Sequence, residues 1–259
     1  MLEFSFSQQE LDAYWEDGYL IRQSVFSKDE VETLVTAAEQ AENHALALSK
    51  LGKTYILDGK RFVDSGHVTI QYEADSDKIK VIEPVHGLNP VLADLVKDSR
   101  IVHPMACILK TKNIALWTDK LNLKGPNGSG FGWHQDSPYW IHDSNHVDLL
   151  PNVLVTFDKA NIENGCLRVI KGSHNKGCLP GKEDGTQLAG FYTNENCFSE
   201  SNSVNMLAPA GSLIFFNPHA IHGSLPNHSK ADRRAMVITY QPGGFPSLKS
   251  KEIYPVSYF

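Results

Sequence analysis

The sequence Leu213-Ile214-Phe215-Phe216, followed by the turn Asn217-Pro218, indicates how this chain folds. Four consecutive apolar residues that end at a turn are typical of a strand buried on both of its faces. Residues 235–240 form a second apolar run of strand length. Together the two runs predict that the later part of the chain builds a β-sheet core.

Other strand-like runs precede these two after about residue 113, at residues 114–123, 152–157 and 166–170. Clusters of turn-forming residues separate the runs, at 125–132, 163–165 and 171–173. Many short strands with regularly spaced turns predict a sandwich or barrel of the jelly-roll kind.

The first half of the chain carries helix signals instead. Capping boxes at Ser7 and Ser27 predict helices that begin at about residues 8 and 28, the second ending near residue 48. Asn89-Pro90 predicts another helix start. We also expect a short strand at 19–21 and a β-hairpin turn at Asp58-Gly59. Helices followed by strands predict an α+β fold, mostly β, with N-terminal helices packed outside the sheet.

Length and composition predict one domain. The chain has 259 residues, 41% hydrophobic and 21% charged, as in ordinary globular proteins. We expect a single domain over residues 1–259, with helices mainly in 1–112 and a jelly-roll core at about 113–245. Residues 175–205 are polar and lack periodicity, so we expect a lid or an insertion near a site there.

Charge and composition disfavour several classes of protein. Lys+Arg 24 against Asp+Glu 30 gives a net charge of −6, whereas nucleic-acid binding needs a positive surface. No apolar run approaches the roughly 20 residues of a membrane span, and the amino terminus lacks the pattern of a signal peptide. We therefore expect a cytoplasmic protein with no membrane or nucleic-acid partner. The four cysteines lack the spacing of a zinc site, and the glycine-rich stretch 125–132 lacks the ending of a phosphate-binding loop.

The segment Gly132-Trp133-His134-Gln135-Asp136 carries the strongest chemical signal. If it is extended, His134 and Asp136 point to the same face and offer an imidazole beside a carboxylate. These are two of the three ligands of a 2-His-1-carboxylate site for non-heme Fe(II). His222, just past the 213–216 strand, is the candidate for the third. The spacing alone leaves a second interpretation open, in which these are a solvated strand end and a loop histidine.

Arg233 and Arg234 open the apolar run 235–240. On a pleated strand they face opposite ways, so one is expected to point inward. An inward guanidinium needs an anion and pairs bidentately with a carboxylate. The other interpretation is again a solvated strand end.

Four separated motifs together resemble the phytanoyl-CoA dioxygenase family. They are Trp133-His134-Gln135-Asp136, Glu163-Asn164-Gly165-Cys166-Leu167, Lys171-Gly172-Ser173-His174, and His222-Gly223-Ser224 with Arg233. The resemblance extends from about residue 8 to about 241. It implies an Fe(II)- and 2-oxoglutarate-dependent oxygenase on a double-stranded β-helix, a cupin-like jelly roll.

The resemblance also implies roles for single residues. His134, Asp136 and His222 match the iron ligands of the family, and Arg233 and Ser224 match residues that hold the distal carboxylate of 2-oxoglutarate. The strand 120–124 resembles that of the ectoine hydroxylase branch, where the positions of Asn122 and Lys124 approach the co-substrate. Leu154 stands where many relatives have tryptophan. The carboxylate at 136 favours oxygenation over chlorination, because halogenating relatives have a small residue there.

The resemblance therefore predicts an enzyme that uses Fe(II), 2-oxoglutarate and O2 to oxidise a small-molecule metabolite in a biosynthetic or tailoring pathway. Hydroxylation is the expected outcome, with demethylation or desaturation as variants. The stretch with His142 and His146, and with Tyr139, Trp140 and Asp143 nearby, is expected to form the rim of a substrate pocket. The other interpretation of this stretch is a solvated loop. The alternatives are a non-catalytic jelly-roll binding protein and a cupin-like isomerase or hydrolase that uses another divalent metal.

Overall fold

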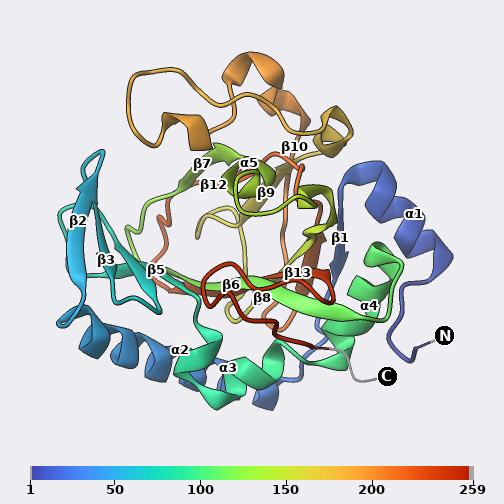
Figure 1. The fold of residues 1–259 in the computed structure, drawn as a ribbon, viewed down its shortest axis with the longest axis horizontal. Coiled ribbons are helices and arrows are strands. Elements are labelled where there is room, and N and C mark those ends of the chain that lie inside the picture. Colours follow the sequence, from blue (N-terminus) through green and yellow to red (C-terminus); the bar gives the residue numbers. More distant parts are fainter. Residues whose placement is uncertain (1, 257–259) are drawn as a thin grey trace.

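Two antiparallel β-sheets face each other in the computed structural model, which describes residues 2–256 (Figure 1). The large sheet has the order β1 (Tyr19–Arg22), β11 (Leu213–Phe216), β8 (Asn152–Thr156), β13 (Arg233–Pro242), β6 (Ile114–Lys124), β5 (Ile79–Glu83), β4 (Thr69–Tyr72), β3 (Lys60–Asp64) and β2 (Lys53–Leu57). The small sheet has the order β10 (Ser203–Asn205), β9 (Leu167–Ile170), β12 (His222–Ser224) and β7 (Phe131–His134). The predicted jelly-roll type of architecture, mostly β, is confirmed.

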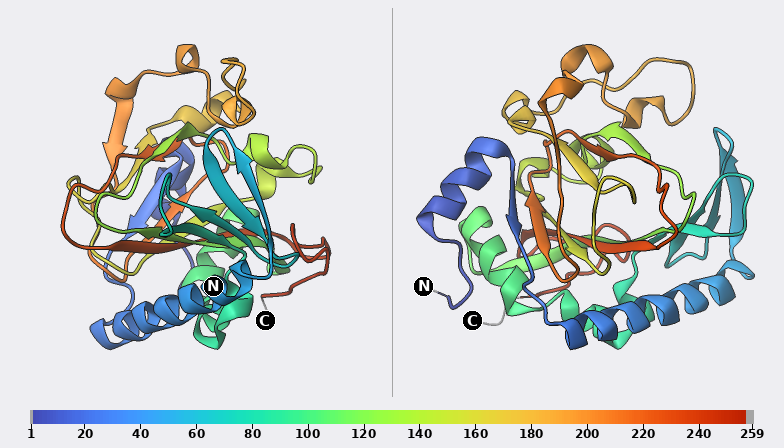
Figure 2. Two further views of the ribbon diagram at one scale, coloured as in Figure 1. Left: turned by 90° about the vertical axis from the view of Figure 1, so that its left-hand side faces the viewer. Right: turned by 180° about the vertical axis from the view of Figure 1, so that it is seen from behind.

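Three helices cover the face of the large sheet that is turned away from the small one (Figures 1 and 2): α2 (Lys28–Ser49), α3 (Pro90–Leu95) and α4 (Ser99–Leu109). α1 (Gln8–Asp17) lies beside β1, and α5 (Ser137–Trp140) lies on the side of the small sheet (Figure 1). Short 3-10 helices are η1 (His86–Leu88), η2 (Val147–Leu149), η3 (Ser173–Lys176), η4 (Ala189–Phe191), η5 (Glu195–Cys197) and η6 (Glu200–Asn202).

Both predicted capping boxes are present. The Ser7 side chain accepts a hydrogen bond from the Glu10 amide, and Ser27 does the same for Glu30, so that each helix starts where the sequence predicts. Gly18 ends α1 in the left-handed conformation with φ of 83°, which glycine adopts without steric cost. The helix expected to run to about residue 48 ends at Ser49.

Helix α4 is a helix that the sequence patterns did not predict. Asp98 caps it, and seven of its side chains are buried. Pro104 lies inside it, a residue that normally interrupts a helix because it has no N–H. Burial of the apolar face against the sheet stabilises this helix in spite of the proline.

Two apolar layers hold the structure together. The larger lies between the large sheet and the helices and contains Ile82, Leu121, Phe215 and Met236. The smaller lies between the two sheets and is formed by residues such as Phe216, Val237 and Val169. Because strand residues alternate between faces, Met236 and Val237 are buried in different layers.

Residues 1–112 supply strands as well as helices. β1 pairs with β11, and β5 pairs with β6, so the large sheet combines strands from this part with strands from the rest of the chain. The hairpin predicted at Asp58-Gly59 joins β2 to β3 and extends the sheet at one edge. In Figure 2 this hairpin rises beside the segment that connects η3 to β10.

That connecting segment, residues 177–202, is here called the lid. It contains short 3-10 helices and one isolated bridge, and it lies over the open side of the small sheet (Figure 1). Asp58 at the hairpin tip accepts hydrogen bonds from the lid amides of Gln187 and Leu188, at 3.1 and 2.6 Å. The rings of Phe191 and Tyr139 stack with centroids 4.5 Å apart. The lid is therefore attached both to the hairpin and to α5.

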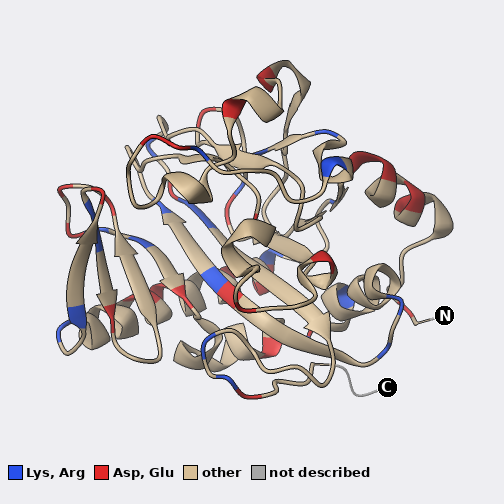
Figure 3. Ribbon diagram, turned by 45° about the horizontal axis from the view of Figure 1, so that its top comes forward, with Lys and Arg blue, Asp and Glu red and all other residues tan. Residues whose placement is uncertain are grey.

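Charged residues of both signs are interspersed over the part of the molecule that Figure 3 shows, with acidic residues gathered on α1. Among residues 2–256, no helix has both the length and the apolar character needed to cross a membrane.

Candidate active site

His134, Asp136 and His222 come together between the two sheets. Their potential ligand atoms all lie within 4.8 Å of one another, and no other group of at least three His, Cys, Asp or Glu side chains in residues 2–256 does so. The His134 and His222 rings are 4.1 Å apart between centroids, and His222 Nε2 is 3.8 Å from Asp136 Oδ2. The three side chains predicted as ligands can therefore share one metal ion.

Strand register explains how residues 88 positions apart in the sequence meet. β7 and β12 are neighbours in the small sheet, and His134 is directly opposite His222. The condition that the segment be extended through residue 136 does not hold, because β7 ends at His134 and Asp136 has helical φ and ψ of −78° and −33°. A turn brings the carboxylate to the histidines instead. It is held by the amides of Asp136 and Ser137, which both donate to the Pro218 carbonyl at 3.1 Å.

Both histidines are oriented by backbone carbonyls two residues before them. His134 Nδ1 lies 2.7 Å from the Gly132 oxygen, and His222 Nδ1 lies 3.0 Å from the Ala220 oxygen. A carbonyl only accepts, so each Nδ1 carries the proton and each Nε2 keeps its lone pair. Such outer hydrogen bonds fix the tautomer that metal-binding histidines use.

The ionisation states also suit a metal. Burial and the neighbouring His222 lower the pKa of His134 to about 3, and burial lowers the pKa of His222, so both rings are neutral. Burial opposes ionisation of Asp136, but Lys120, His222 and His134 outweigh it and lower the pKa of this carboxyl. Two neutral imidazoles and one carboxylate are the donor set of non-heme Fe(II).

One atom of this group indicates that a cation belongs there. Asp136 Oδ2 is buried and has no hydrogen-bond partner among the described residues. A buried charged oxygen without a partner is costly, and a metal ion removes that cost. The residues present therefore fit an Fe(II) ion.

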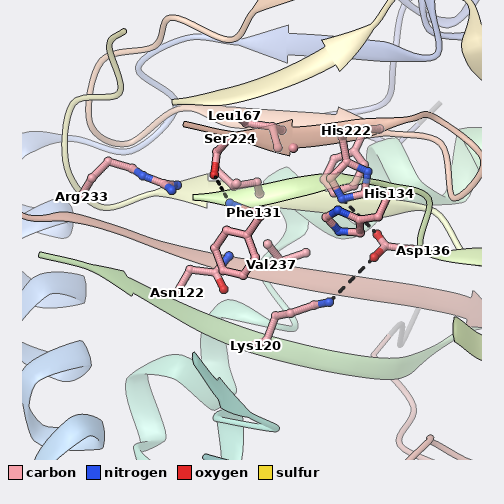
Figure 4. Close-up of a pocket in the computed structure, with 13 residues that line it drawn as sticks. Lys120, Asn122, Phe131, His134, Asp136, Leu167, His222, Ser224, Arg233 and Val237 are labelled. Carbon is pink, nitrogen blue, oxygen red and sulfur yellow. Dashed lines mark hydrogen bonds and ion pairs between the residues drawn. The ribbon is translucent and has the colours of Figure 1, made fainter. Parts of the chain in front are cut away.

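A cavity extends from these three side chains toward Arg233. Figure 4 shows the three at one end and Arg233 at the other, with Ser224 between. The remaining walls are mainly apolar and are formed by Phe131, Leu154, Leu167, Phe216 and Val237, with Lys120, Asn122 and Gly223.

Arg233 is the inward arginine of the pair, as strand alternation predicts. It is 3% exposed, its Nε has no hydrogen-bond partner, and no carboxylate of the described residues forms an ion pair with it. Arg234 faces the other way and binds Asp158 through two nitrogens, at 2.8 and 2.9 Å. A buried guanidinium without an anion fits a ligand that brings a carboxylate, such as 2-oxoglutarate.

Lys124 and Ser224 adjoin Arg233. Arg233 and Lys124 are paired across β13 and β6, and Lys124 Nζ donates to Ser224 Oγ at 2.7 Å. Lys124 also donates to the carbonyls of Leu225 and Gly165, at 2.6 and 3.2 Å. Burial, followed by the charge of Arg233, lowers the pKa of Lys124 to about 6. Lys124 lies behind the cavity wall, while Arg233 and Ser224 line it, so this end of the cavity presents a guanidinium and a hydroxyl without a neighbouring carboxylate.

Gly165 is required for that arrangement. Its φ is +68°, and a Cβ there would lie 2.1 Å from the Leu225 oxygen. Only glycine allows the two carbonyls that Lys124 contacts to come together. This explains the glycine in the Glu163-Asn164-Gly165 motif.

Asn122 and Leu154 also occupy the cavity wall, as predicted. Asn122 Oδ1 is buried and lacks a partner among the described residues, so it can accept from a ligand. Leu154 leaves an apolar surface where many relatives have tryptophan.

Two residues beside the metal ligands were not predicted. Lys120 Nζ lies 3.8 Å from Asp136 Oδ1, and period-2 alternation from Asn122 is the signal that places it on the cavity face. Gln135 is fully buried, and its side chain contacts Gly177, Leu179 and His219. The sequence carries no signal for those contacts.

The expected rim is present in part. Tyr139, Trp140 and Asp143 line a second cavity that opens beside His134 and Asp136. His142 and His146 do not line it. His146 lies near Gln241 instead, with Nε2 3.1 Å from the Gln241 Oε1 atom.

Comparison with known proteins agrees with this geometry. The sequence model of the phytanoyl-CoA dioxygenase family matches residues 14–235. A probable alpha-ketoglutarate-dependent hypophosphite dioxygenase of Stutzerimonas stutzeri is 27% identical over 246 residues, which are 91% of this chain and 78% of the relative. An ectoine dioxygenase of Sphingopyxis alaskensis is 27% identical over 248 residues, 90% of this chain and 75% of the relative.

A solved structure shares the fold. It is EctD from S. alaskensis with 2-oxoglutarate and 5-hydroxyectoine, with a TM-score of 0.72 and 23% identity over 93% of this chain and 78% of that chain. A likeness over 93% of the chain confirms the predicted double-stranded β-helix core. With most of its length matched by one family model, the chain belongs to the phytanoyl-CoA dioxygenase family of Fe(II)- and 2-oxoglutarate-dependent oxygenases.

Proposed function

We propose that this protein hydroxylates a small polar metabolite, using Fe(II), 2-oxoglutarate and O2. One observation carries the proposal. A complete facial triad and an unpaired buried arginine occupy opposite ends of one cavity in a member of an oxygenase family. A protein that only binds a ligand does not need both a metal-binding triad and an arginine that binds the co-substrate.

In this proposal the chain divides the work between the two ends of the cavity. His134, Asp136 and His222 hold Fe(II), while Arg233, Ser224, Lys124 and Asn122 hold 2-oxoglutarate. When bound, the metal and 2-oxoglutarate supply the oxidising chemistry, in which O2 is consumed and 2-oxoglutarate becomes succinate and CO2. The chain itself orients the ligands, neutralises the carboxylates of the co-substrate and limits the access of water.

The substrate is assigned to the second cavity, which reaches the metal side of the first. The two cavities share Lys120, Phe131, His134 and Asp136. The lid forms part of its roof through Leu188, Phe191 and Tyr192. Relatives named for hypophosphite and ectoine support a small molecule as substrate. We further propose a biosynthetic or tailoring role in the cytoplasm, without a nucleic-acid or membrane partner, which the net charge of −6 supports.

Release of succinate tests the reaction type. Purified protein with Fe(II), ascorbate, 2-oxoglutarate and O2 is expected to form succinate, faster when a substrate such as ectoine or hypophosphite is accepted. Product masses are expected to rise by one oxygen atom. Turnover that continues without O2 would indicate an isomerase or hydrolase. Ligand binding without any succinate would indicate a non-catalytic binding protein.

Metal binding tests the ligand set separately from turnover. His222→Ala is expected to lower Co(II) affinity by at least about 10-fold and to change the visible spectrum of the Co(II) form. The exposed His142 provides the matched control, since His142→Ala removes an imidazole that contacts neither cavity. Unchanged Co(II) binding in the His222 variant would refute the assignment of this ligand.

A further inference from the structure

The second cavity has a polar floor and an aromatic roof. One face of strands β3 to β6 supplies the floor, including Lys60, Thr69, Gln71, Glu83 and Thr118. Aromatic side chains from α5 and the lid supply the roof: Tyr139, Trp140, Phe191 and Tyr192. The opposite face of the same strands packs into the main core through Val63, Ile70, Ile82 and Leu121. A ligand in this cavity therefore meets polar side chains from the strands and aromatic ones from α5 and the lid.

Two of the three lysines that line this cavity have a carboxylate partner. Lys249 Nζ lies 3.5 Å from Asp64 and 2.9 Å from the Thr69 hydroxyl, and Lys120 lies 3.8 Å from Asp136. Lys60 differs from both. No carboxylate of residues 2–256 comes within ion-pair distance of it.

Lys60 instead contacts a phenol that belongs to the lid. Its Nζ donates to the Tyr192 hydroxyl at 2.5 Å and lies 5.0 Å from the centre of that ring. The phenol oxygen accepts from the ammonium, so its own proton remains free to donate. Lys60 and Tyr192 thus present two adjacent donors to the cavity.

Lys60 is partly buried, and its side chain contacts the Tyr192 hydroxyl and no carboxylate of residues 2–256. Partly buried cations of this kind are stabilised when an anion binds.

We infer that Lys60 and Tyr192 form the binding site for an oxyanion group of the substrate, a carboxylate or a phosphonate. The inference rests on the proposed function, because it concerns the substrate of the same cavity. Lys60 supplies the charge, and the Tyr192 hydroxyl supplies a second hydrogen bond. Since Tyr192 belongs to the lid, a bound oxyanion also connects the lid to β3.

Binding of simple anions to the metal-free protein tests the inference without turnover. The probes are methylphosphonate, hypophosphite and L-proline, measured by calorimetry. The expected result is that at least one probe binds and that Lys60→Met weakens it by about 10- to 100-fold, as for loss of a charged hydrogen bond. Lys60→Arg should restore most of the affinity. Tyr192→Phe should weaken binding by about 2- to 10-fold.

Two controls separate this site from its surroundings. Lys249→Met removes a lysine of the same cavity that already has a carboxylate partner, and it should leave the affinity of the probe unchanged. Asp58→Ala releases two lid amides without removing the cation, and it should change the affinity less than about 3-fold. If Asp58→Ala weakens binding as much as Lys60→Met, the lysine acts through the lid and the inference is wrong.

The remaining outcomes are also distinct. If none of the three probes binds to the unmodified protein, or if Lys60→Met binds them equally well, the oxyanion site is refuted. Succinate formation by the unmodified protein would still support the oxygenase in that case. If no succinate forms but anions bind at Lys60, the proposed oxygenase activity is refuted while the oxyanion site is supported.

Discussion

At the scale of single residues, Arg233 and Arg234 show how one strand register assigns opposite roles to identical neighbours. Arg233 is buried and has no anion, whereas Arg234 binds Asp158 and Glu39 on the outer face. The burial of each follows from alternation along β13, whose next residues Ala235 and Met236 are buried in different layers. The difference gives a direct test of co-substrate binding.

Arg233→Ala is expected to raise the apparent 2-oxoglutarate constant by roughly 30-fold or more. Loss of a buried charged partner costs about 2–5 kcal/mol, and each 1.4 kcal/mol corresponds to about tenfold. Arg234→Ala should leave that constant nearly unchanged but lower the free energy of unfolding by about 1–2 kcal/mol, because it leaves Asp158 without its bidentate partner. Succinate formation against 2-oxoglutarate concentration, with urea unfolding of both variants, measures the two effects. The reverse pattern would contradict the register.

Lys124 predicts a pH dependence. Its pKa is about 6 in the folded protein and about 10.5 in the unfolded chain, so between these values the unfolded chain carries a proton that the folded one lacks. The free energy of unfolding should therefore rise with pH across this window. Lys124→Met should reduce that rise, as measured by urea unfolding between pH 6.5 and pH 9. An equal slope in both proteins would show that Lys124 is charged when folded.

The same residue predicts proton uptake when 2-oxoglutarate binds. A carboxylate beside Lys124 and Arg233 favours the charged lysine and raises its pKa. At pH 8, calorimetry in buffers of different ionisation enthalpy should detect more proton uptake for the unmodified protein than for Lys124→Met. Identical uptake would show that the carboxylate does not approach this lysine.

At the scale of elements, the turn from β7 to α5 is held by hydrogen bonds between the Gln135 side chain and three other residues. The Gln135 amide donates to the carbonyls of Gly177 and His219, at 2.8 and 2.6 Å, and its oxygen accepts from the Leu179 amide at 2.8 Å. Gly177 and Leu179 begin the lid, and His219 precedes the distal metal ligand by three residues. Gln135 thus joins the metal-ligand turn to the lid and to the segment before β12.

Gln135→Met is therefore expected to disturb the metal site and the lid together. The Co(II) spectrum should change, and lid amides such as Leu188 should exchange hydrogen faster by about 5-fold or more, because the lid loses an anchor. Gln241 is the matched control, being fully buried and bonded to the carbonyls of Leu116, Phe245 and Pro246, none of which belongs to the lid or to the metal-ligand turn. Gln241→Met should destabilise the fold by about 1–3 kcal/mol and leave both signals unchanged. Equal signals from both variants would indicate a general loss of packing.

At the scale of the whole molecule, the large sheet joins the helix-rich part of the chain, residues 1–112, to the part that follows it. β1 and β5 from the first part pair with β11 and β6 from the second. Neither part can complete the sheet without the other. We therefore propose that the chain is one domain over residues 1–259, as its composition predicts.

A single domain should unfold in one cooperative transition. Far- and near-ultraviolet circular dichroism are expected to give the same midpoint, and two separated midpoints would indicate more than one unit. Anaerobic Fe(II) with 2-oxoglutarate, at about 100 times the dissociation constant, should raise the midpoint by about 5–10 °C. The Arg233→Ala variant should show a smaller rise under the same conditions.

The sequence by itself determined the local elements, because their signals lie within a few residues. The capping boxes at Ser7 and Ser27 begin helices where expected, and the apolar run 213–216 forms a buried strand. The ligands His134, Asp136 and His222 were also predicted, from a spaced motif and a family resemblance. The structure brings them together, while their role as iron ligands stays a prediction.

Only the tertiary structure decided which distant segments meet. Local propensity predicts no helix at 99–109, where Pro104 is tolerated because the apolar face is buried. The segment 132–136 is not extended through Asp136. A turn forms there because the amides of Asp136 and Ser137 donate to the carbonyl of Pro218, which belongs to a distant segment. Contacts such as Lys60 with Tyr192 and Gln135 with the lid involve residues 132 and 44 positions apart. They depend on strand register and chain packing, and no local pattern of residues encodes them.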